Sequence, residues 1–201
     1  MIVIVDYGIG NLAAIKNMFK RIGVQSEISR DIKKIENASK IVLPGVGAFD
    51  SAMKKLNEGG FKPILDKKAL EERVPVMGIC LGMQLLMESS EEGGNKGLGW
   101  IKGKAKKFSF IDRSIKVPHM GWNKTKIKKH HKVVDGLEES KFYFVHSFHV
   151  EVEDGNDRLM ETFYGIPFDS AVQKGNIFGF QFHPEKSHKY GMKLFNNFSK
   201  I

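Results

Sequence analysis

The spacing of apolar and polar residues in the first half of the chain predicts strands and helices in alternation. The unbroken β-branched run at residues 2–6 is typical of a strand that is buried on both faces. In residues 11–23 the apolar side chains recur at helical spacing, and a glycine stands where such a helix would end. Repeated strand–helix units of this length predict a parallel sheet with helices on both faces. Similar patterns predict further strands at 24–29, 40–44 and 74–79 and further helices at 49–56, 61–72 and 81–90.

The pattern changes in the second half of the chain, from residue 97 onward. Short aromatic or β-branched runs alternate there with Gly, Asp and Asn, which predicts antiparallel hairpins, and a closing helix is expected at 190–201. No linker or low-complexity segment separates the two halves. We therefore expect one domain over residues 1–201, with an α/β fold: a three-layer sandwich whose central sheet is mainly parallel and carries an antiparallel extension.

Composition adds limits on the class of protein. The 201 residues are 41% hydrophobic and 27% charged, which is ordinary for a globular domain, and no apolar run is long enough to span a membrane. We expect no signal peptide, because the apolar N-terminus lacks a basic leader, and the single cysteine suits a reducing cytoplasm. The net charge of +9 leaves a nucleic-acid partner, an acidic protein partner and a lysine-rich proteome open. The lysine-rich stretch 124–132 has no interleaved aromatic residues, so we expect no nucleic-acid partner.

The only cysteine, Cys80, stands between an apolar strand and a helical pattern, with Gly78 and Gly82 on either side. The form G-x-C-x-G resembles the G-x-S-x-G elbow, a sharp strand-to-helix turn that presents a nucleophile above the sheet. Glycines allow that turn without Cβ clashes, and a helix N-terminus stabilises a thiolate. A buried structural cysteine is commoner in general, but this position favours a nucleophile.

A catalytic thiol needs a base, and the base needs a group that orients it. His183 lies at the end of an aromatic-rich strand, Pro184 stops that strand, and Glu185 follows. This corner can turn the carboxylate back toward one imidazole nitrogen while the other nitrogen faces the thiol. Among the other histidines, His130 and His131 lie in the lysine-rich stretch, and His119, His146 and His149 are candidates for structural or pocket-lining positions.

Acyl transfer also needs backbone N–H groups that meet the negative charge on the carbonyl oxygen. The glycine-rich turn in residues 42–49 ends another parallel strand, where neighbouring loops converge above the sheet. The N–H group of Leu81, directly after the nucleophile, is a second natural donor. Together these features indicate thiol-based acyl transfer on an α/β sheet.

Three segments in order, "PGVGAF", "GICLGMQLL" and "FQFHPEKS", resemble the class I (triad-type) glutamine amidotransferases. Three more, "DYGIGNL", "PHMGWN" and "YFVHSFHV", narrow the resemblance to the glutaminase subunits of imidazole glycerol phosphate synthase, and it covers essentially the whole chain. It implies a Cys80–His183–Glu185 triad that hydrolyses glutamine to glutamate and ammonia through a thioester.

The resemblance also implies a partner: a (β/α)₈ cyclase subunit that forms a heterodimer with the chain and receives the ammonia in histidine biosynthesis. A paralogous glutaminase that feeds a sugar amidotransferase in surface-polysaccharide biosynthesis is the alternative. The further residues that the resemblance assigns are Gly45, Val46, Gly47 and Leu81 around the oxyanion, Gln84, His146, Ser147 and Phe148 around the substrate, Asn11, Trp122 and Lys186 at the partner interface, and Met120 and Gly121 at the ammonia exit.

Two competing interpretations explain less of the sequence. Gly8, Gly10 and Ala13 match the G-x-G-x-x-A dinucleotide fingerprint, but nothing later in the chain indicates hydride transfer. A zinc site is not expected, because there is no second cysteine and the "HSFH" histidines lack further ligands. We expect neither a cofactor nor a metal.

Overall fold

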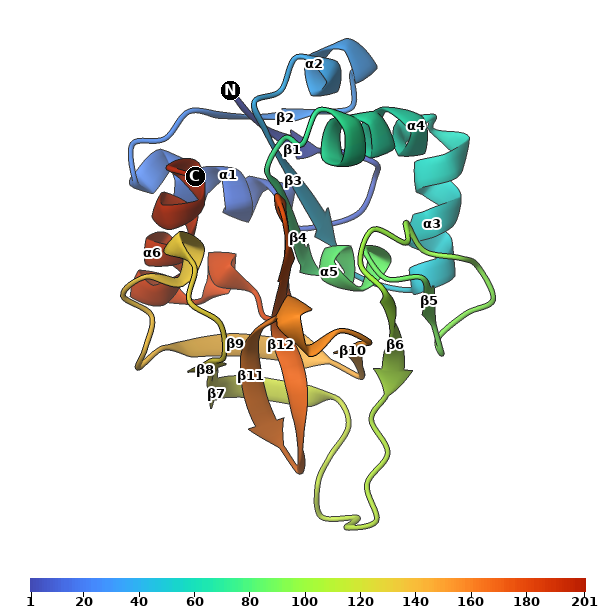
Figure 1. Cartoon of the computed structure of the whole chain (residues 1–201), viewed down its shortest axis with the longest axis vertical. Coiled ribbons are helices and arrows are strands. Elements are labelled where there is room, and N and C mark those ends of the chain that lie inside the picture. The colour runs from blue at the N-terminus through green and yellow to red at the C-terminus, as the bar shows by residue number, and fades with distance from the viewer.

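The computed structural model describes residues 1–201 and has a mixed sheet at its centre, with helices on both faces of the parallel part (Figure 1). Five neighbouring strands in this part run parallel, in the order β2-β1-β3-β4-β13. The strands expected in the first half are therefore confirmed, as is the fold class. The bounds are β1 (Ile2–Val5), β2 (Ser26–Ser29), β3 (Lys40–Gly45), β4 (Val76–Cys80) and β13 (Ile177–Phe180).

The two faces of the parallel strands bury two separate apolar clusters. Alternate residues of β1 point to opposite faces: Ile2 and Ile4 join one cluster, and Val3 and Val5 join the other. In Figure 1, α1 and α6 lie to the left of the parallel strands and α3, α4 and α5 lie to the right. The helix bounds are α1 (Leu12–Arg21), α2 (Ile32–Glu36), α3 (Phe49–Glu58), α4 (Phe61–Asp66), α5 (Leu81–Leu85) and α6 (His188–Ser199).

The second half of the chain extends the sheet with antiparallel strands, as expected. Strand β12 runs antiparallel to β13, β11 and β10, while β7 and β9 form a separate two-stranded sheet. Because the main sheet takes strands from both halves, we retain the proposal of a single domain. The bounds are β5 (Ser89–Ser90), β6 (Gly103–Lys107), β7 (His119–Lys124), β8 (Lys126–Ile127), β9 (Lys141–His146), β10 (Phe148–Val152), β11 (Arg158–Tyr164) and β12 (Ile166–Lys174).

Two of the expected helices differ from the structure, the first in its length and the second in its type. The helix expected at 81–90 ends at Leu85, because backbone N–H groups of the 97–101 loop donate to its last carbonyls, Leu98 N to Leu85 O at 2.8 Å among them. The helix expected at 61–72 is α4 followed by a π-helical turn at Lys67–Glu71. None of the helices combines the length and the apolar character that crossing a membrane requires.

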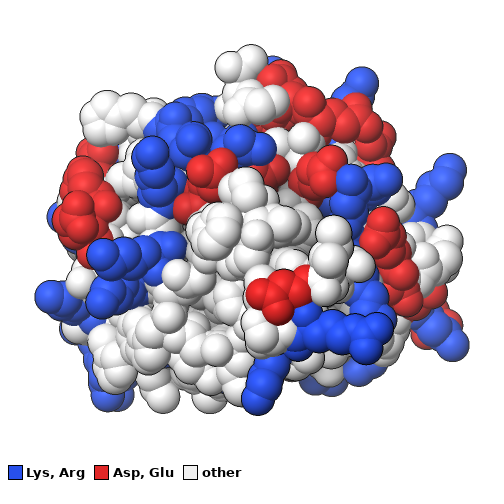
Figure 2. Space-filling view, turned by 90° about the horizontal axis from the view of Figure 1, so that it is seen from below, with Lys and Arg blue, Asp and Glu red and all other residues white.

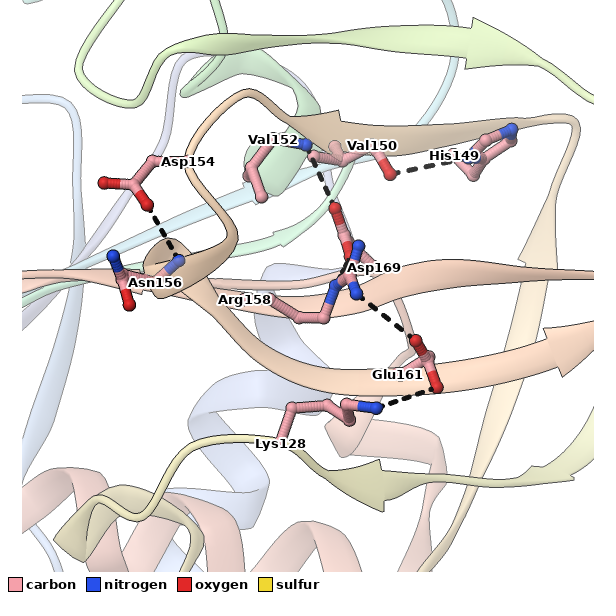
Figure 3. Close-up of polar contacts among 9 residues, drawn as sticks. All are labelled: Lys128, His149, Val150, Val152, Asp154, Asn156, Arg158, Glu161 and Asp169. Carbon is pink, nitrogen blue, oxygen red and sulfur yellow. Dashed lines mark hydrogen bonds and ion pairs between the residues drawn. The ribbon is translucent and has the colours of Figure 1, made fainter.

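A chain of ion pairs ties the antiparallel strands together (Figure 3). Asp169 on β12 is only 1% exposed; its carboxylate accepts the N–H of Val152 at 3.0 Å and pairs with Arg158 on β11. Arg158 also contacts Glu161 at 3.4 Å, and Glu161 pairs with Lys128 at 3.4 Å. The chain therefore runs from a buried carboxylate to an exposed lysine and links β10, β11 and β12.

Candidate active site

Cys80 ends β4 in a strained backbone conformation. Its φ is 54° and its ψ is −111°, although it is not a glycine, and the next residue begins α5. Such strain in a non-glycine residue is concentrated at functional sites, and here it produces the sharp strand-to-helix turn expected of an elbow. The flanking glycines are required by close packing: a Cβ on Gly82 would lie 1.9 Å from the Leu43 carbonyl oxygen, and one on Gly78 would lie 2.6 Å from the Gly82 oxygen.

His183 and Glu185 form a buried pair. The imidazole Nδ1 and the carboxylate Oε1 are 2.8 Å apart, and both side chains are almost fully buried. The other imidazole nitrogen, Nε2, is buried without a hydrogen-bond partner. Burial lowers the pKa of His183, but the neighbouring Cys80 sulfur and the Glu185 carboxylate favour the charged ring, outweigh burial and raise the pKa to about 10. The arrangement therefore favours an imidazolium at neutral pH, which would stabilise a neighbouring thiolate.

The backbone around His183 is held by strand β9. The His183 N–H donates to the Tyr143 carbonyl at 2.9 Å, and the Ser187 hydroxyl donates to the His183 carbonyl at 2.6 Å. The same hydroxyl accepts the Tyr143 N–H at 3.0 Å, and Ser187 is fully buried. Ser187 is absent from the sequence-based site, because a serine two residues after the glutamate has no chemistry of its own to attract notice.

A cavity of about 550 Å³ lies over Cys80 and joins most of the site residues expected from the sequence. The turn after β3, the start of α5 and the junction of β9 with β10 line this cavity. The expected residues on its wall are Cys80, His183, Val46, Gly47, Leu81, Gln84, His146, Ser147, Phe148 and Lys186.

Other expected residues lie outside the cavity wall. Gly45 is the last residue of β3, and a Cβ there would lie 2.7 Å from the Gly82 nitrogen, so it allows β3 to pack against α5. On β7, Met120 and Trp122 are 62% and 47% exposed, with Gly121 between them. Asn11 is an exposed residue at the start of α1.

Glu92 is a cavity residue that the sequence did not indicate. It is the one carboxylate on the wall, and its Oε2 accepts the N–H of Phe49 at 2.8 Å, at the start of α3. In the sequence it belongs to the polar run "SSEEGGNK", which is typical of a solvated loop. Only the folding of that loop onto α3 brings the carboxylate to the cavity.

The Gly8–Gly10 turn has structural reasons for its glycines. Gly8 has a φ of 84°, which favours glycine, and its carbonyl accepts the Lys55 ammonium at 3.0 Å; a Cβ on Gly10 would lie 3.0 Å from the Pro44 Cβ. Glu27 on β2, the position where a dinucleotide-binding protein could carry an acid for the ribose, is paired with Lys34. These contacts account for the turn without a dinucleotide.

Comparisons with known proteins agree with the geometry. The family model described as glutamine amidotransferase class-I matches residues 3–201. The protein named imidazole glycerol phosphate synthase subunit HisH 2 of Methanococcus maripaludis is 54% identical over 201 residues, which cover 100% of this chain and 99% of that one. Its namesake in Pseudomonas aeruginosa is 48% identical over 202 residues, which cover 100% of both chains.

Solved structures share the fold. A structure described as a glutamine amidotransferase has a TM-score of 0.73 at 19% identity, covering 98% of this chain and 97% of that one. Another, described as PurLQS from Thermotoga maritima, has a TM-score of 0.72 at 19% identity, covering 99% and 97%. The chain belongs to the class I glutamine amidotransferases and, within them, to the HisH subunits of imidazole glycerol phosphate synthase.

Proposed function

We propose that this chain hydrolyses glutamine to glutamate and ammonia through a thioester on Cys80 and passes the ammonia to a cyclase subunit in histidine biosynthesis. The observation that carries the proposal is the single cavity in which the strained Cys80 elbow meets His183, whose Nδ1 is held by Glu185 at 2.8 Å. Neither the sugar-amidotransferase alternative nor dinucleotide binding gains support from the comparisons.

The proposed reaction has two acyl-transfer steps. In the first, the Cys80 Sγ attacks the side-chain amide carbon of glutamine, the C–N bond breaks, and His183 gives a proton to the departing ammonia. In the second, His183 takes a proton from water as the water attacks the thioester, and glutamate leaves with the thiol restored. Glu185 keeps the imidazole oriented throughout. The N–H of Leu81 and the backbone of the Val46–Gly47 turn are the proposed donors to the oxyanion.

The cavity wall also offers groups for the amino-acid end of glutamine. The Glu92 carboxylate suits the α-ammonium group, because it is the one negative charge on the wall. Gln84 donates both amide hydrogens to the protein, to the Phe148 carbonyl and to Gln181 Oε1, each at 3.1 Å. Its side chain is therefore fixed before substrate arrives.

We further propose that the cyclase, a (β/α)₈ protein, docks at the end of the molecule that carries β7, to form a heterodimer. Figure 2 views this end and shows a broad area without charged side chains, bordered by both signs of charge. Large exposed apolar residues come from β7 and from the segments around it: Ile111, Val117, Met120, Trp122 and Phe163. Exposed apolar area of this kind marks interaction sites. Trp122 stacks on His188 at 5.5 Å between ring centroids, and Asn11 and Lys186 remain proposed partner contacts.

Glutamate production from glutamine tests both proposals. The chain would be measured alone and with the cyclase and its nucleotide ligand, and Cys80→Ala would be the control in each case. We expect weak activity alone, strong stimulation by the cyclase, and no turnover by Cys80→Ala. For Glu185→Gln we expect a smaller loss than for Cys80→Ala, since the carboxylate only orients the base. Turnover by Cys80→Ala would refute the chemistry, and stimulation only by a sugar amidotransferase with its nucleotide sugar would refute the pathway.

A further inference from the structure

Three buried histidines, one on the cavity wall and two outside it, take no part in the proposed proton transfers. His119, His146 and His149 are 2%, 6% and 6% exposed and are surrounded by aromatic rings. His119 lies between two rings, with centroids 4.6 Å from Phe144 and 4.0 Å from Tyr164. The pairing of β7 with β9 sets His119 directly opposite His146. Phenylalanine would pack among these aromatic rings as well as histidine does. The presence of ring nitrogens at these buried positions therefore needs a separate explanation.

The hydrogen-bond partners assign the protons on two of these rings. His146 Nδ1 lies 2.7 Å from the Phe148 carbonyl oxygen, which can only accept, so Nδ1 carries the proton. Burial lowers the pKa of His146 to about 3, so the ring is neutral and its Nε2 accepts. The donor to Nε2 is His119 Nδ1, at 2.9 Å. His119 Nε2 therefore accepts in turn.

The outer donor is Asn123, whose amide is fixed in orientation. Its Oδ1 accepts the Lys124 N–H at 2.8 Å, and its Nδ2 donates to His119 Nε2 at 3.2 Å and to the Phe163 carbonyl at 3.0 Å. Asn123, His119 and His146 thus form an imidazole chain in which every hydrogen bond points the same way, from β7 toward the cavity.

The inner end of the imidazole chain is the carbonyl of Phe148, a residue of the cavity wall. Phe148 O accepts His146 Nδ1 from one side and Gln84 Nε2, at 3.1 Å, from the other. Gln84 donates its second amide hydrogen to Gln181 Oε1, and Gln181 Nε2 lies 3.8 Å from the Cys80 sulfur. A displaced Phe148 carbonyl would therefore disturb Gln84 and the group that touches the thiol.

We propose that His119 and Asn123 are positioning residues for the glutaminase site, which act through His146 to fix the Phe148 carbonyl and the Gln84 amide where glutamine binds. The proposal rests on the proposed function of the cavity. Neither residue lines the cavity. Their effect is on how well the pocket is formed, not on the reactivity of the thiol.

The first test reads the ring protons directly, and it does not depend on glutaminase activity. In the chain labelled with ¹⁵N-histidine, we expect the nitrogen shifts of His119 and His146 to show Nδ1–H tautomers, the less common form of a free imidazole. An Nε2–H tautomer at either ring would overturn the proposal. The tautomers therefore test the positioning role separately from the proposed function. If the wild-type complex hydrolysed no glutamine, the proposed function would be refuted, and the tautomer result would still stand.

The second test compares two matched substitutions in the complex with the cyclase and its ligand. His119→Phe keeps the ring stack and removes the imidazole chain, while His149→Phe makes the same change at a buried histidine outside it. We expect His119→Phe to raise KM for glutamine about tenfold, equivalent to the loss of one buried hydrogen bond. The rate of Cys80 alkylation by iodoacetamide should change less than about twofold. For His149→Phe we expect both quantities to stay within about twofold.

If the two substitutions changed KM equally, or if His119→Phe had no effect on KM, the proposal would be wrong and the histidines would have only a packing role. Circular dichroism shows whether each variant folds. If His119→Phe fails to fold, Asn123→Asp takes its place, because a carboxylate at this half-buried position cannot donate to His119 Nε2. We then expect a higher KM together with an Nε2–H tautomer at His119. An unchanged tautomer and KM in Asn123→Asp would overturn the proposal.

Discussion

Replacing Asp169 by Asn should destabilise the protein far more than its small change in shape suggests. The Asp169 carboxylate is 1% exposed and uses both oxygens, one for the Val152 N–H and one for Arg158. An asparagine has only one acceptor oxygen, so its NH₂ group must face one of these two donors. The change therefore removes a charged partner and also leaves a buried donor unsatisfied (Figure 3).

The structure sets the size of the effect. Breaking a fully buried ion pair from one side costs about 3–5 kcal/mol, and an unsatisfied buried donor costs about 1–3 kcal/mol. The Arg158 side chain is 35% exposed, so water can solvate part of the charge that is left behind. We therefore expect a loss of about 3 kcal/mol in the free energy of unfolding, or about 6–12 °C in Tm for a chain of this length.

Thermal and urea unfolding at pH 7, followed by circular dichroism, would measure the loss. The matched control is Glu161→Gln at the outer end of the same ion-pair chain. Glu161 is 23% exposed and both of its contacts are 3.4 Å long, so its replacement should cost less than about 1 kcal/mol. Equal losses for the two variants, or a loss under about 1 kcal/mol for Asp169→Asn, would refute the argument from burial.

Three further predictions concern Cys80 and Gly82 in the elbow and the buried His119. Cys80→Gly should be more stable than Cys80→Ala by about 1 kcal/mol in thermal unfolding, because glycine adopts the φ of 54° without Cβ strain; equal stability would mean that the elbow is unstrained. Gly82→Ala should lower stability by about 3 kcal/mol and abolish turnover, since its Cβ would lie 1.9 Å from a carbonyl oxygen; an active, stable variant would contradict this. Burial lowers the pKa of His119 from 6.5 to about 4, so the folded state favours the neutral ring. The stability that the neutral His119 ring contributes is therefore complete above pH 6.5 and falls by up to about 3 kcal/mol as the pH decreases to 4. The free energy of unfolding of His119→Phe should therefore decline less steeply than that of the wild type across this pH range.

Much of the site could be predicted because its chemistry is carried by short motifs. Cys80 is flanked by glycines within five residues, and the His183–Glu185 pair spans three, so each motif fixes its own local geometry. The parallel strands β1, β3 and β4 were also predictable, because strands buried on both faces have nearly unbroken apolar runs. The resemblance then joined the separate motifs into one site.

The rest depends on contacts between distant residues, which local patterns do not contain. Glu92 reaches the cavity only because its loop folds onto α3, and His119 meets His146 only through the register of β7 with β9. The helix expected at 81–90 has sound periodicity, but the 97–101 loop takes the carbonyls that would continue it. In each case tertiary contacts override or complete what the local sequence indicates.

Because the chain has a single cysteine, thiol labelling can measure the number of candidate active sites in a sample. Cys80 lines the cavity and the chain has no other thiol, so each thiol that a maleimide dye modifies in the folded protein is one proposed nucleophile. Dye stoichiometry would report the fraction of molecules with an intact elbow without any turnover measurement. In a Cys80→Ala background, one cysteine introduced on the outer face of β7 would be a unique attachment point for a fluorophore, and its emission would follow partner docking directly.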